Sequence, residues 1–376
     1  MNLKLLFSLI FGVFSLNPKN MRFLNLKRFM MVLLLFPIFI SFLIINKTFL
    51  YIDYLVFPCF RKEKIKDPIF IVSTPRSGTT YLYHSIVEYS NKFTYFKLWE
   101  IVFAPSIIQK YIFINLLKMD KSIGSPIKKV ILYLDNKLFT DLKTIHLIGI
   151  NLPEEDEAVL LWDLTSLYLN FFYPDSHFFD ELLFFDKKLP KKRSNRIMNS
   201  YLNYVRRHNY VFNRNGDKTF ISKNPLMMCK LESVRSYFPD AKVIQIIRNP
   251  KETLPSTISL NNTLYSLFTS QKPNLEINEK TKAVLIQWYQ MADEALAKYP
   301  DEQVLNVDFK KLISLDKEAE ECIRQFLKDP TFQLIVKMES KKKLEHQSKN
   351  QYKKLEQTEF DKVMNQLPFL NKYLKS

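Results

Sequence analysis

Glycine is scarce in this sequence, with 5 residues among 376. No Gly-x-Gly-x-x-Gly pattern occurs, which argues against a dinucleotide-binding fold of the usual kind. The nucleoside triphosphatase pattern, Gly-x-x-x-x-Gly-Lys-Ser/Thr, is also missing. Any phosphate-binding loop in this chain must therefore be of another type.

Cysteine and histidine are scarce as well, with 3 and 5 residues. Cys59, Cys229 and Cys322 are far apart and odd in number, so they indicate neither a disulfide framework nor a zinc site. The histidines show no His-x-x-x-His spacing, which argues against a metal centre. We therefore expect no bound metal.

Acidic residues are outnumbered, with 38 Asp and Glu against 55 Lys and Arg, a net charge of +17. This excess favours an anionic partner, which is a phosphate ligand, a nucleic acid or an anionic membrane surface. Basic and aromatic residues are not interleaved as in a nucleic-acid-binding module, so we expect no nucleic acid partner. The shares of apolar (47%) and charged (25%) residues are those of a globular chain.

Long apolar runs distinguish the N-terminal region from the rest of the chain. Leu5 to Leu16 is apolar, and Phe29 to Ile45 is 17 residues without a charge. A membrane-spanning helix needs roughly 17–25 such residues. Cations lie on both sides of these runs, so the positive-inside rule does not decide an orientation. We expect residues 1–60 to anchor the chain in a membrane; a buried helix pair is the alternative.

From Pro68 onward, predicted strands alternate with predicted helices. This alternation predicts a three-layer α/β fold with a central parallel sheet, formed by residues 66–376. The expected strands include Ile69–Ser73, Ala241–Ile247 and Gln303–Phe309, and the expected helices include Thr79–Tyr89, Glu155–Tyr168 and Arg193–Tyr210.

The sequence Pro-Arg-Ser-Gly-Thr-Thr follows the first predicted strand directly. In such folds, ligands bind beyond the carboxyl ends of the strands, and the N–H groups at a helix start attract anions. Gly78 allows the backbone to approach a phosphate closely, and Arg76 adds a planar cation. Ser77, Thr79 and Thr80 add hydroxyl donors. The full strand–loop–helix context favours an anion-binding loop over an ordinary capped helix.

A second corner of the same kind follows the strand Ala241–Ile247. Arg248 comes directly at the end of this strand, and Ser256 lies eight residues further on in the next predicted helix. Asn249 and Pro250 suit the N-cap and first position of that helix. An arginine that ends a buried strand is placed for a ligand at the sheet edge, although alone it could equally be a capping or salt-bridging residue.

These two corners carry a resemblance to a known family. The segment "STPRSGTTYL" resembles the 5′-phosphosulfate loop of sulfotransferases that use 3′-phosphoadenosine 5′-phosphosulfate (PAPS), and "IIRNPKETLPS" resembles their 3′-phosphate-binding strand and helix. The segments "LPEEDEAVLL" and "QVLNVDFKKL" are similar to the membrane-associated, mostly bacterial branch. The resemblance implies a P-loop-like fold and metal-independent, in-line transfer of a sulfuryl group from PAPS to an acceptor hydroxyl or amine.

The resemblance also implies roles for particular residues. Arg248 and Ser256 would hold the 3′-phosphate, and Lys223, in "ISKNPLM", would neutralise the leaving phosphate. A basic tract after Lys341 would close over the nucleotide. The 5′-phosphosulfate would be held by Arg76, Ser77, Gly78, Thr79 and Thr80.

The general base of such a reaction has two candidates. Glu100 lies 22 residues after Gly78, in a region where several branches place a catalytic glutamate. His146 follows Lys143 and resembles the Lys-x-His base of the cytosolic branch, with one extra residue in the spacing. The acidic run Glu154–Glu157 reads as the first turn of a helix, and it also suits orienting a cation or a direct catalytic role.

The sequence thus predicts a membrane-anchored sulfotransferase. The alternatives are a P-loop-type nucleotide kinase, which would need magnesium and the missing lysine, and a basic membrane-surface binding protein. The acceptor is not readable, so lipid, carbohydrate, small-molecule and protein acceptors stay open. The domain would face the cytoplasm in a bacterium and the Golgi lumen in a eukaryote.

Overall fold

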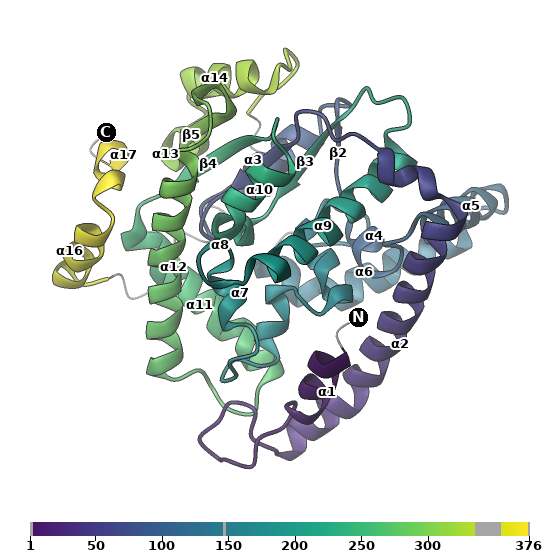
Figure 1. Ribbon diagram of the computed structural model, residues 1–376, viewed down its shortest axis with the longest axis horizontal. Helices are drawn as coiled ribbons and strands as arrows, with labels where there is room; N and C mark the ends of the chain where they lie inside the picture. The colour runs from purple at the N-terminus through teal and green to yellow at the C-terminus, as the bar shows by residue number, and fades with distance from the viewer. Residues whose placement is uncertain (1–2, 146–147, 335–354, 375–376) are drawn as a thin grey trace.

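The computed structural model describes residues 3–145, 148–334 and 355–374. Its centre is a five-stranded sheet in the order β2-β3-β1-β4-β5, and all four pairings are parallel (Figure 1). The strands are β1 (Ile69–Val72), β2 (Phe93–Thr94), β3 (Thr219–Lys223), β4 (Lys242–Ile247) and β5 (Val304–Asp308).

Alternate residues of the central strands face two separate hydrophobic layers. Phe70 and Val72 of β1 join a core with α9 (Lys191–Phe212) and α12 (Leu275–Leu296). Ile69 and Ile71 join a second core with α3 (Thr79–Val87) and α14 (Lys317–Leu327). A strand that is buried on both faces needs a largely apolar run. β1 is apolar throughout, and β4 is apolar apart from Lys242 at its start and the buried Gln245. The predicted three-layer α/β fold with a central parallel sheet is confirmed.

Helices cover both faces of the sheet. The face with Ile69 carries α3 (Thr79–Val87), α13 (Phe309–Ile313) and α14 (Lys317–Leu327); the face with Phe70 carries α9 (Lys191–Phe212), α10 (Leu231–Tyr237) and α12 (Leu275–Leu296). The other helices are α1 (Leu3–Phe11), α2 (Leu26–Val56), α4 (Leu98–Val102), α5 (Ile107–Ser122), α6 (Pro126–Ile145), α7 (Asp180–Leu183), α8 (Phe185–Lys188), α11 (Pro250–Phe268), α16 (Gln357–Gln366) and α17 (Asn371–Leu374).

One predicted helix is different in the structure. The segment expected to be a helix over Glu155–Tyr168 forms a 3₁₀ helix, η2 (Asp156–Asp163), and a second one, η3 (Leu167–Phe171). Leu164 separates them with φ = 58°. The side chains of Asp156 and Glu157 turn into buried hydrogen bonds instead of facing solvent as in an acidic first turn. This buried polar network overrides the helical periodicity of the sequence.

The apolar N-terminal region forms α1 and the long helix α2, which runs along the edge of the molecule (Figure 1). By length and composition alone, α2 is the one helix among the described residues that qualifies to cross a membrane. Only 11% of its most apolar window is buried, so α2 is not a core helix of the ordinary kind. The division into segments 1–60 and 66–376 stays a prediction.

Candidate active site

The loop between β1 and α3 has the geometry of an anion-binding turn. Gly78 is the N-cap of α3 with φ = +86°, and no side chain caps this helix. A Cβ atom at Gly78 would lie 2.8 Å from the ring of Phe309, so only glycine fits there. The N–H groups and the positive dipole end of α3 therefore face the loop without a competing side chain.

A buried network of hydroxyl groups holds this loop against the protein interior. The Oγ1 of Thr74 lies 3.0 Å from the Oγ of Ser77 and 2.8 Å from the hydroxyl of Tyr289 on α12. Ser77 is fully buried and does not line the cavity described below, whereas Arg76, Gly78, Thr79 and Thr80 do. The predicted loop residues therefore come together, with the Ser77 side chain turned inward.

The second predicted corner touches the first. Arg248 directly follows β4, the neighbour of β1, and its Nη1 donates to the carbonyl of Arg76 at 2.7 Å. The Nε of Arg76 donates to the Oγ of Ser256 at 3.2 Å. Asn249 is the N-cap of α11 as predicted, with its side chain accepting from the Lys251 N–H. Residues 172 and 180 positions apart thus form one cationic corner.

Arg248 has further contacts that fix its side chain. Its guanidinium lies 4.0 Å from the ring centre of Phe309 and pairs with Glu252 at 2.9 Å. Glu252 is about half exposed, so water screens this pair and its contribution to stability is small. A phosphate at this corner would meet an arginine that is already oriented.

Lys223, at the end of β3, is buried and paired with Glu155 at 2.6 Å. The second carboxylate oxygen of Glu155 accepts a hydrogen bond from the hydroxyl of Tyr168. Burial, and then the charge of Glu155, raises the pKa of Tyr168 well above its ordinary value. Glu155 therefore orients the ammonium group of Lys223 at the carboxyl edge of the sheet. Orienting a cation was one of the roles that the sequence suggested for the acidic run.

The other carboxylates of the acidic run have structural partners. Asp156 accepts from Tyr201, Ser222 and Asn224, and burial raises the pKa of Asp156 to about 6. Glu157 pairs with Lys230 at 3.0 Å inside the protein. Each of these carboxylates ties η2 to a different element.

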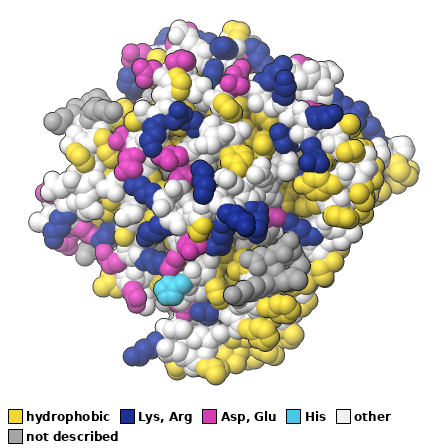
Figure 2. Space-filling model, in the orientation of Figure 1, with side chains coloured by type: hydrophobic (Ala, Val, Ile, Leu, Met, Phe, Trp, Pro, Cys, Tyr) yellow, Lys and Arg dark blue, Asp and Glu magenta, His cyan; other side chains and the backbone are white. Residues whose placement is uncertain are grey.

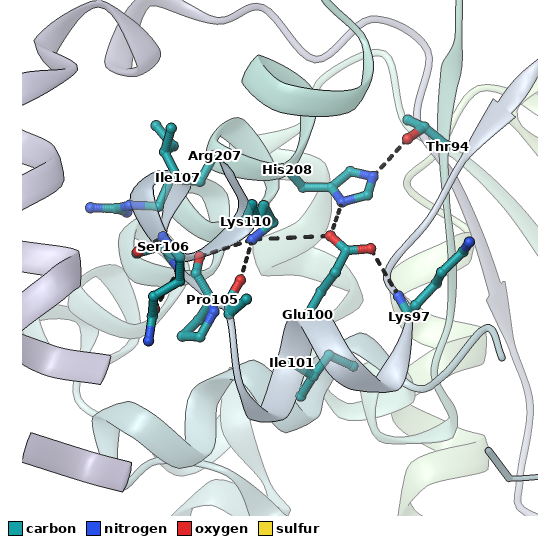
Figure 3. Close-up of polar contacts among 12 residues, drawn as sticks. Thr94, Lys97, Glu100, Ile101, Pro105, Ser106, Ile107, Lys110, Arg207 and His208 are labelled. Carbon is teal, nitrogen blue, oxygen red and sulfur yellow. Dashed lines mark hydrogen bonds and ion pairs between the residues drawn. The ribbon is translucent and has the colours of Figure 1, made fainter. Parts of the chain in front are cut away.

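Glu100, a predicted general base, lies in a buried cluster on α4 (Figure 3). Its Oε2 is 2.8 Å from Nδ1 of His208 and 4.0 Å from Nζ of Lys110, and its Oε1 accepts from the Lys97 N–H. Burial lowers the pKa of Lys110 to about 8, and the charge of Glu100 opposes this shift. Glu100 is not among the residues that line the cavity, so its catalytic role stays a prediction.

Two sequence predictions fall on residues outside the described part of the chain. His146, the other candidate base, lies there, and so does most of the basic tract after Lys341. Within the described ranges, no group of three or more His, Cys, Asp or Glu residues is placed to hold a metal ion. The expectation of a metal-free reaction stays a prediction.

A cavity of about 1060 Å³ begins at the anion-binding loop. Its polar end includes Arg76, Thr79, Arg248 and Glu155. Its other walls are mostly apolar and come from α1, α2, α11, α12 and the segment after η2, with Asn170, Asn261 and Lys280 as polar members. Pockets for drug-sized ligands are usually about 300–1,000 Å³, so this one has room for a large ligand.

The structure adds a pair that sequence reasoning missed. His84 on α3 and Glu88, its C-cap residue, line the cavity, with Nδ1 of His84 3.2 Å from Oε1 of Glu88. The i, i+4 spacing on the helix that starts at the anion-binding loop was the available signal. A histidine held by a carboxylate has the form of a general base with its orienting partner.

Comparison with known proteins defines the class. The profile of the Sulfotransferase family matches residues 68–331, and the chain belongs to this family. The omega-hydroxy-beta-dihydromenaquinone-9 sulfotransferase Stf3 of Mycobacterium bovis is 29% identical over 152 residues, which cover 39% of this chain and 37% of that protein. The match thus spans little more than a third of this curated relative.

Solved structures share the fold. The crystal structure of sulfotransferase STF9 from Mycobacterium avium has a TM-score of 0.62 at 14% identity and covers 87% of this chain and 81% of that one. Sulfotransferase STF1 from Mycobacterium tuberculosis has a TM-score of 0.56 at 18% identity, covering 85% and 80%. The predicted membership of the sulfotransferase superfamily is confirmed.

Proposed function

We propose that this protein is a sulfotransferase that takes the sulfuryl group from PAPS and gives it to an acceptor hydroxyl or amine. The hydrogen bond from Arg248 to the carbonyl of Arg76 carries the proposal. It joins the loop that suits the 5′-phosphosulfate to the strand end that suits the 3′-phosphate. Two anion sites at one sheet edge suit a nucleotide with phosphates at both positions.

The proposed reaction is an in-line displacement at sulfur. The acceptor oxygen or nitrogen forms a bond to sulfur while the bond from sulfur to the bridging phosphate oxygen breaks. The electron pair of that bond stays on the phosphate, and the acceptor's proton passes to a base. The N–H groups of α3, Arg76 and Lys223 would stabilise the charge on the departing phosphate, which leaves as 3′-phosphoadenosine 5′-phosphate.

Two candidates for the general base lie among the described residues, while His146, outside them, stays a prediction. Glu100 is the sequence-predicted one, and it faces His208 and Lys110 in a buried cluster. The His84–Glu88 pair lies at the cavity wall next to the loop. The position of His84 supports it as the group that takes the proton from an acceptor in the cavity.

The comparisons support this function over a kinase. The family matched is that of sulfotransferases, and the mycobacterial relative is named for a hydroxylated dihydromenaquinone, which suits a hydroxyl acceptor. The apolar helix α2 supports attachment to a membrane. Since that relative is bacterial, we favour a catalytic domain on the cytoplasmic face, where PAPS is made.

A thermal-shift experiment tests the donor. With 3′-phosphoadenosine 5′-phosphate at about 100 times its Kd, we expect the melting temperature to rise by about 5 °C. The rise should occur in EDTA as well as in magnesium, and Arg248→Ala should lose it. Arg196→Ala, on the exposed face of α9, is the matched control and should keep it. A rise that needs magnesium and prefers ATP would support the kinase instead.

A further inference from the structure

The cavity has an apolar end that the donor nucleotide does not need. It extends from the anion-binding loop to the N-terminal helices, where Leu9, Val13, Val32, Phe36, Phe39 and Phe42 line it. Sulfuryl transfer requires a single nucleophilic atom at the loop. A long apolar space behind that point therefore indicates an acceptor with a large apolar body.

Helix α2 is apolar on both of its sides. Val32, Phe36 and Phe39 face the cavity, whereas Met30, Leu33 and Leu34 are 55–65% exposed on the outside. Figure 2 shows hydrophobic side chains gathered along the right and lower right of the molecule, where α2 lies in Figure 1. A monomeric soluble protein rarely exposes so much contiguous apolar surface.

The cavity opens on this apolar side. Leu35 and Ile38 line the cavity and are also 36% and 49% exposed. These two side chains therefore mark a mouth that connects the cavity with the outer surface of α2. All the side chains that α1 and α2 contribute to the cavity are apolar, so a ligand that passes this mouth meets an apolar wall.

Both ends of α2 are tied to the α/β domain by buried polar side chains. Arg28 donates to the carbonyls of Val13, Phe172 and Phe268. Asp53 pairs with Arg207 at 2.8 Å and accepts from the N–H of Ile107. The 25 residues between Arg28 and Asp53 rise about 38 Å in a helix, more than the roughly 30 Å of a bilayer's hydrocarbon core.

Such attachment fits a helix that lies in the membrane plane. If α2 crossed the bilayer, the polar domain fixed to both of its ends would have to cross it too, which burial of its charges forbids. Helix α5 packs against α2, and α6 packs against α5. These two helices carry further exposed apolar side chains, namely Leu116, Leu117, Val130 and Tyr133. They also carry exposed cations suited to anionic headgroups, namely Lys118, Lys121, Lys128 and Lys129.

Building on the proposed sulfotransferase function, we propose that the acceptor is a membrane lipid with a hydroxyl at the end of a long apolar chain. Helix α2 lies in the bilayer surface and forms one wall of the acceptor site. The lipid enters sideways past Leu35 and Ile38, its chain fills the space behind α2, and its hydroxyl reaches the loop at Thr79 and His84.

Cysteine labelling tests the placement of α2. Leu26→Cys and Lys62→Cys, each in a Cys59→Ser, Cys322→Ser background, report the two ends of α2, and the third native cysteine, Cys229, is buried. We expect a membrane-impermeant maleimide to label both positions from the same side of the membrane. Labelling from opposite sides, or recovery of the protein without membranes, would overturn the in-plane placement.

Binding of hexadecan-1-ol in detergent micelles tests the acceptor site. Val32→Trp fills the cavity, whereas Leu33→Trp adds the same bulk to the outer face of the same helix. We expect Val32→Trp to weaken hexadecanol binding by about tenfold or more and Leu33→Trp to leave it unchanged. Ile38→Trp, at the exposed mouth, is the second variant because it perturbs folding less.

Binding of 3′-phosphoadenosine 5′-phosphate to the same variants separates this proposal from the proposed function. We expect every variant to keep the nucleotide Kd within about twofold, since the substitutions lie far from the cationic corner. If the nucleotide binds but Val32→Trp and Ile38→Trp both take up hexadecanol as the wild type does, the lipid site is wrong. Equal competition by butan-1-ol would also overturn it. Loss of nucleotide binding in the wild type would instead refute the donor site.

Discussion

The Nη1 of Arg248 lies 2.7 Å from the carbonyl oxygen of Arg76 and donates a hydrogen bond to it. This bond fixes the strand end of β4 against the loop that follows β1. Arg76 has φ = 70°, a conformation uncommon for arginine, and the contact supports it there. The loop conformation and the second anion site therefore depend on each other.

Gly78→Ala tests the shape of the loop. An alanine with positive φ costs about 1–2 kcal/mol, and its Cβ would also strike the ring of Phe309. We expect at least a tenfold loss of affinity for 3′-phosphoadenosine 5′-phosphate, measured by calorimetry, since about 1.4 kcal/mol is tenfold. Gly216→Ala is the control, because Gly216 also has positive φ but nothing lies within 4 Å of its Cβ position. Equal nucleotide affinity in both variants would contradict the close approach.

Much of the anion-binding corner could be predicted because each part is local. A strand, a loop and a helix start lie within a few residues around Gly78, and Asn249 shows its capping role in the sequence. The contact between Arg248 and Arg76 forms because β4 lies beside β1. The order of strands in a sheet cannot be read from a local sequence pattern. The two-residue strand β2 gave no detectable signal.

The sequence suggested that the acidic run orients a cation, but it did not show that Glu155 would pair with Lys223. The two residues are 68 positions apart, and Glu155 is the N-cap of η2, so only the tertiary fold brings it to the end of β3. The helical prediction there used apolar periodicity, which does not reveal that Asp156 and Glu157 have buried partners. The apolar N-terminal runs were evident in the sequence. The cavity between α2 and the α/β domain was not, because it forms only when these parts pack together.

Glu155→Gln tests the buried pair. Removing the carboxylate leaves the ammonium of Lys223 buried without its counter-charge, which costs about 3–5 kcal/mol of unfolding free energy. The double variant Glu155→Gln with Lys223→Met should recover much of this loss, and urea denaturation measures both. As a control, Glu294→Gln breaks the exposed Lys187–Glu294 pair and should cost less than about 1 kcal/mol. A near-neutral Glu155→Gln would show that Lys223 does not need this partner.

His84→Gln and Glu100→Gln distinguish the two candidate bases that lie among the described residues. Because His84 lines the cavity, we expect His84→Gln to lower kcat by about 10²–10⁴-fold, with nucleotide affinity unchanged. We expect Glu100→Gln to lower stability, since it removes the charge that His208 and Lys110 face. Turnover and urea denaturation of both variants provide the measurement. A large fall in kcat in a fully stable Glu100→Gln variant would assign the base to Glu100.

The raised pKa of Asp156 predicts that the free energy of unfolding depends on pH. Burial raises its pKa from 3.8 in the unfolded chain to about 6, so the folded state binds the proton more tightly. Its contribution to stability therefore grows as pH falls from above 6 toward 4. Relative to Asp156→Asn, the wild type should gain about 1.4 kcal/mol of unfolding free energy between pH 7.5 and pH 5. Asp217→Asn, at an exposed site, should show no such difference, and a change of opposite sign for Asp156 would contradict the shift.

The most direct test compares two nucleotides on two proteins by calorimetry. The ligands are 3′-phosphoadenosine 5′-phosphate and adenosine 5′-phosphate, which differ only in the 3′-phosphate, and the proteins are the wild type and Arg248→Ala. We predict that the wild type binds the 3′-phosphorylated nucleotide at least about a hundredfold more tightly, and that Arg248→Ala removes most of this difference while adenosine 5′-phosphate binding changes little. Equal binding of the two nucleotides by the wild type would contradict a PAPS site at the Arg76–Arg248 corner.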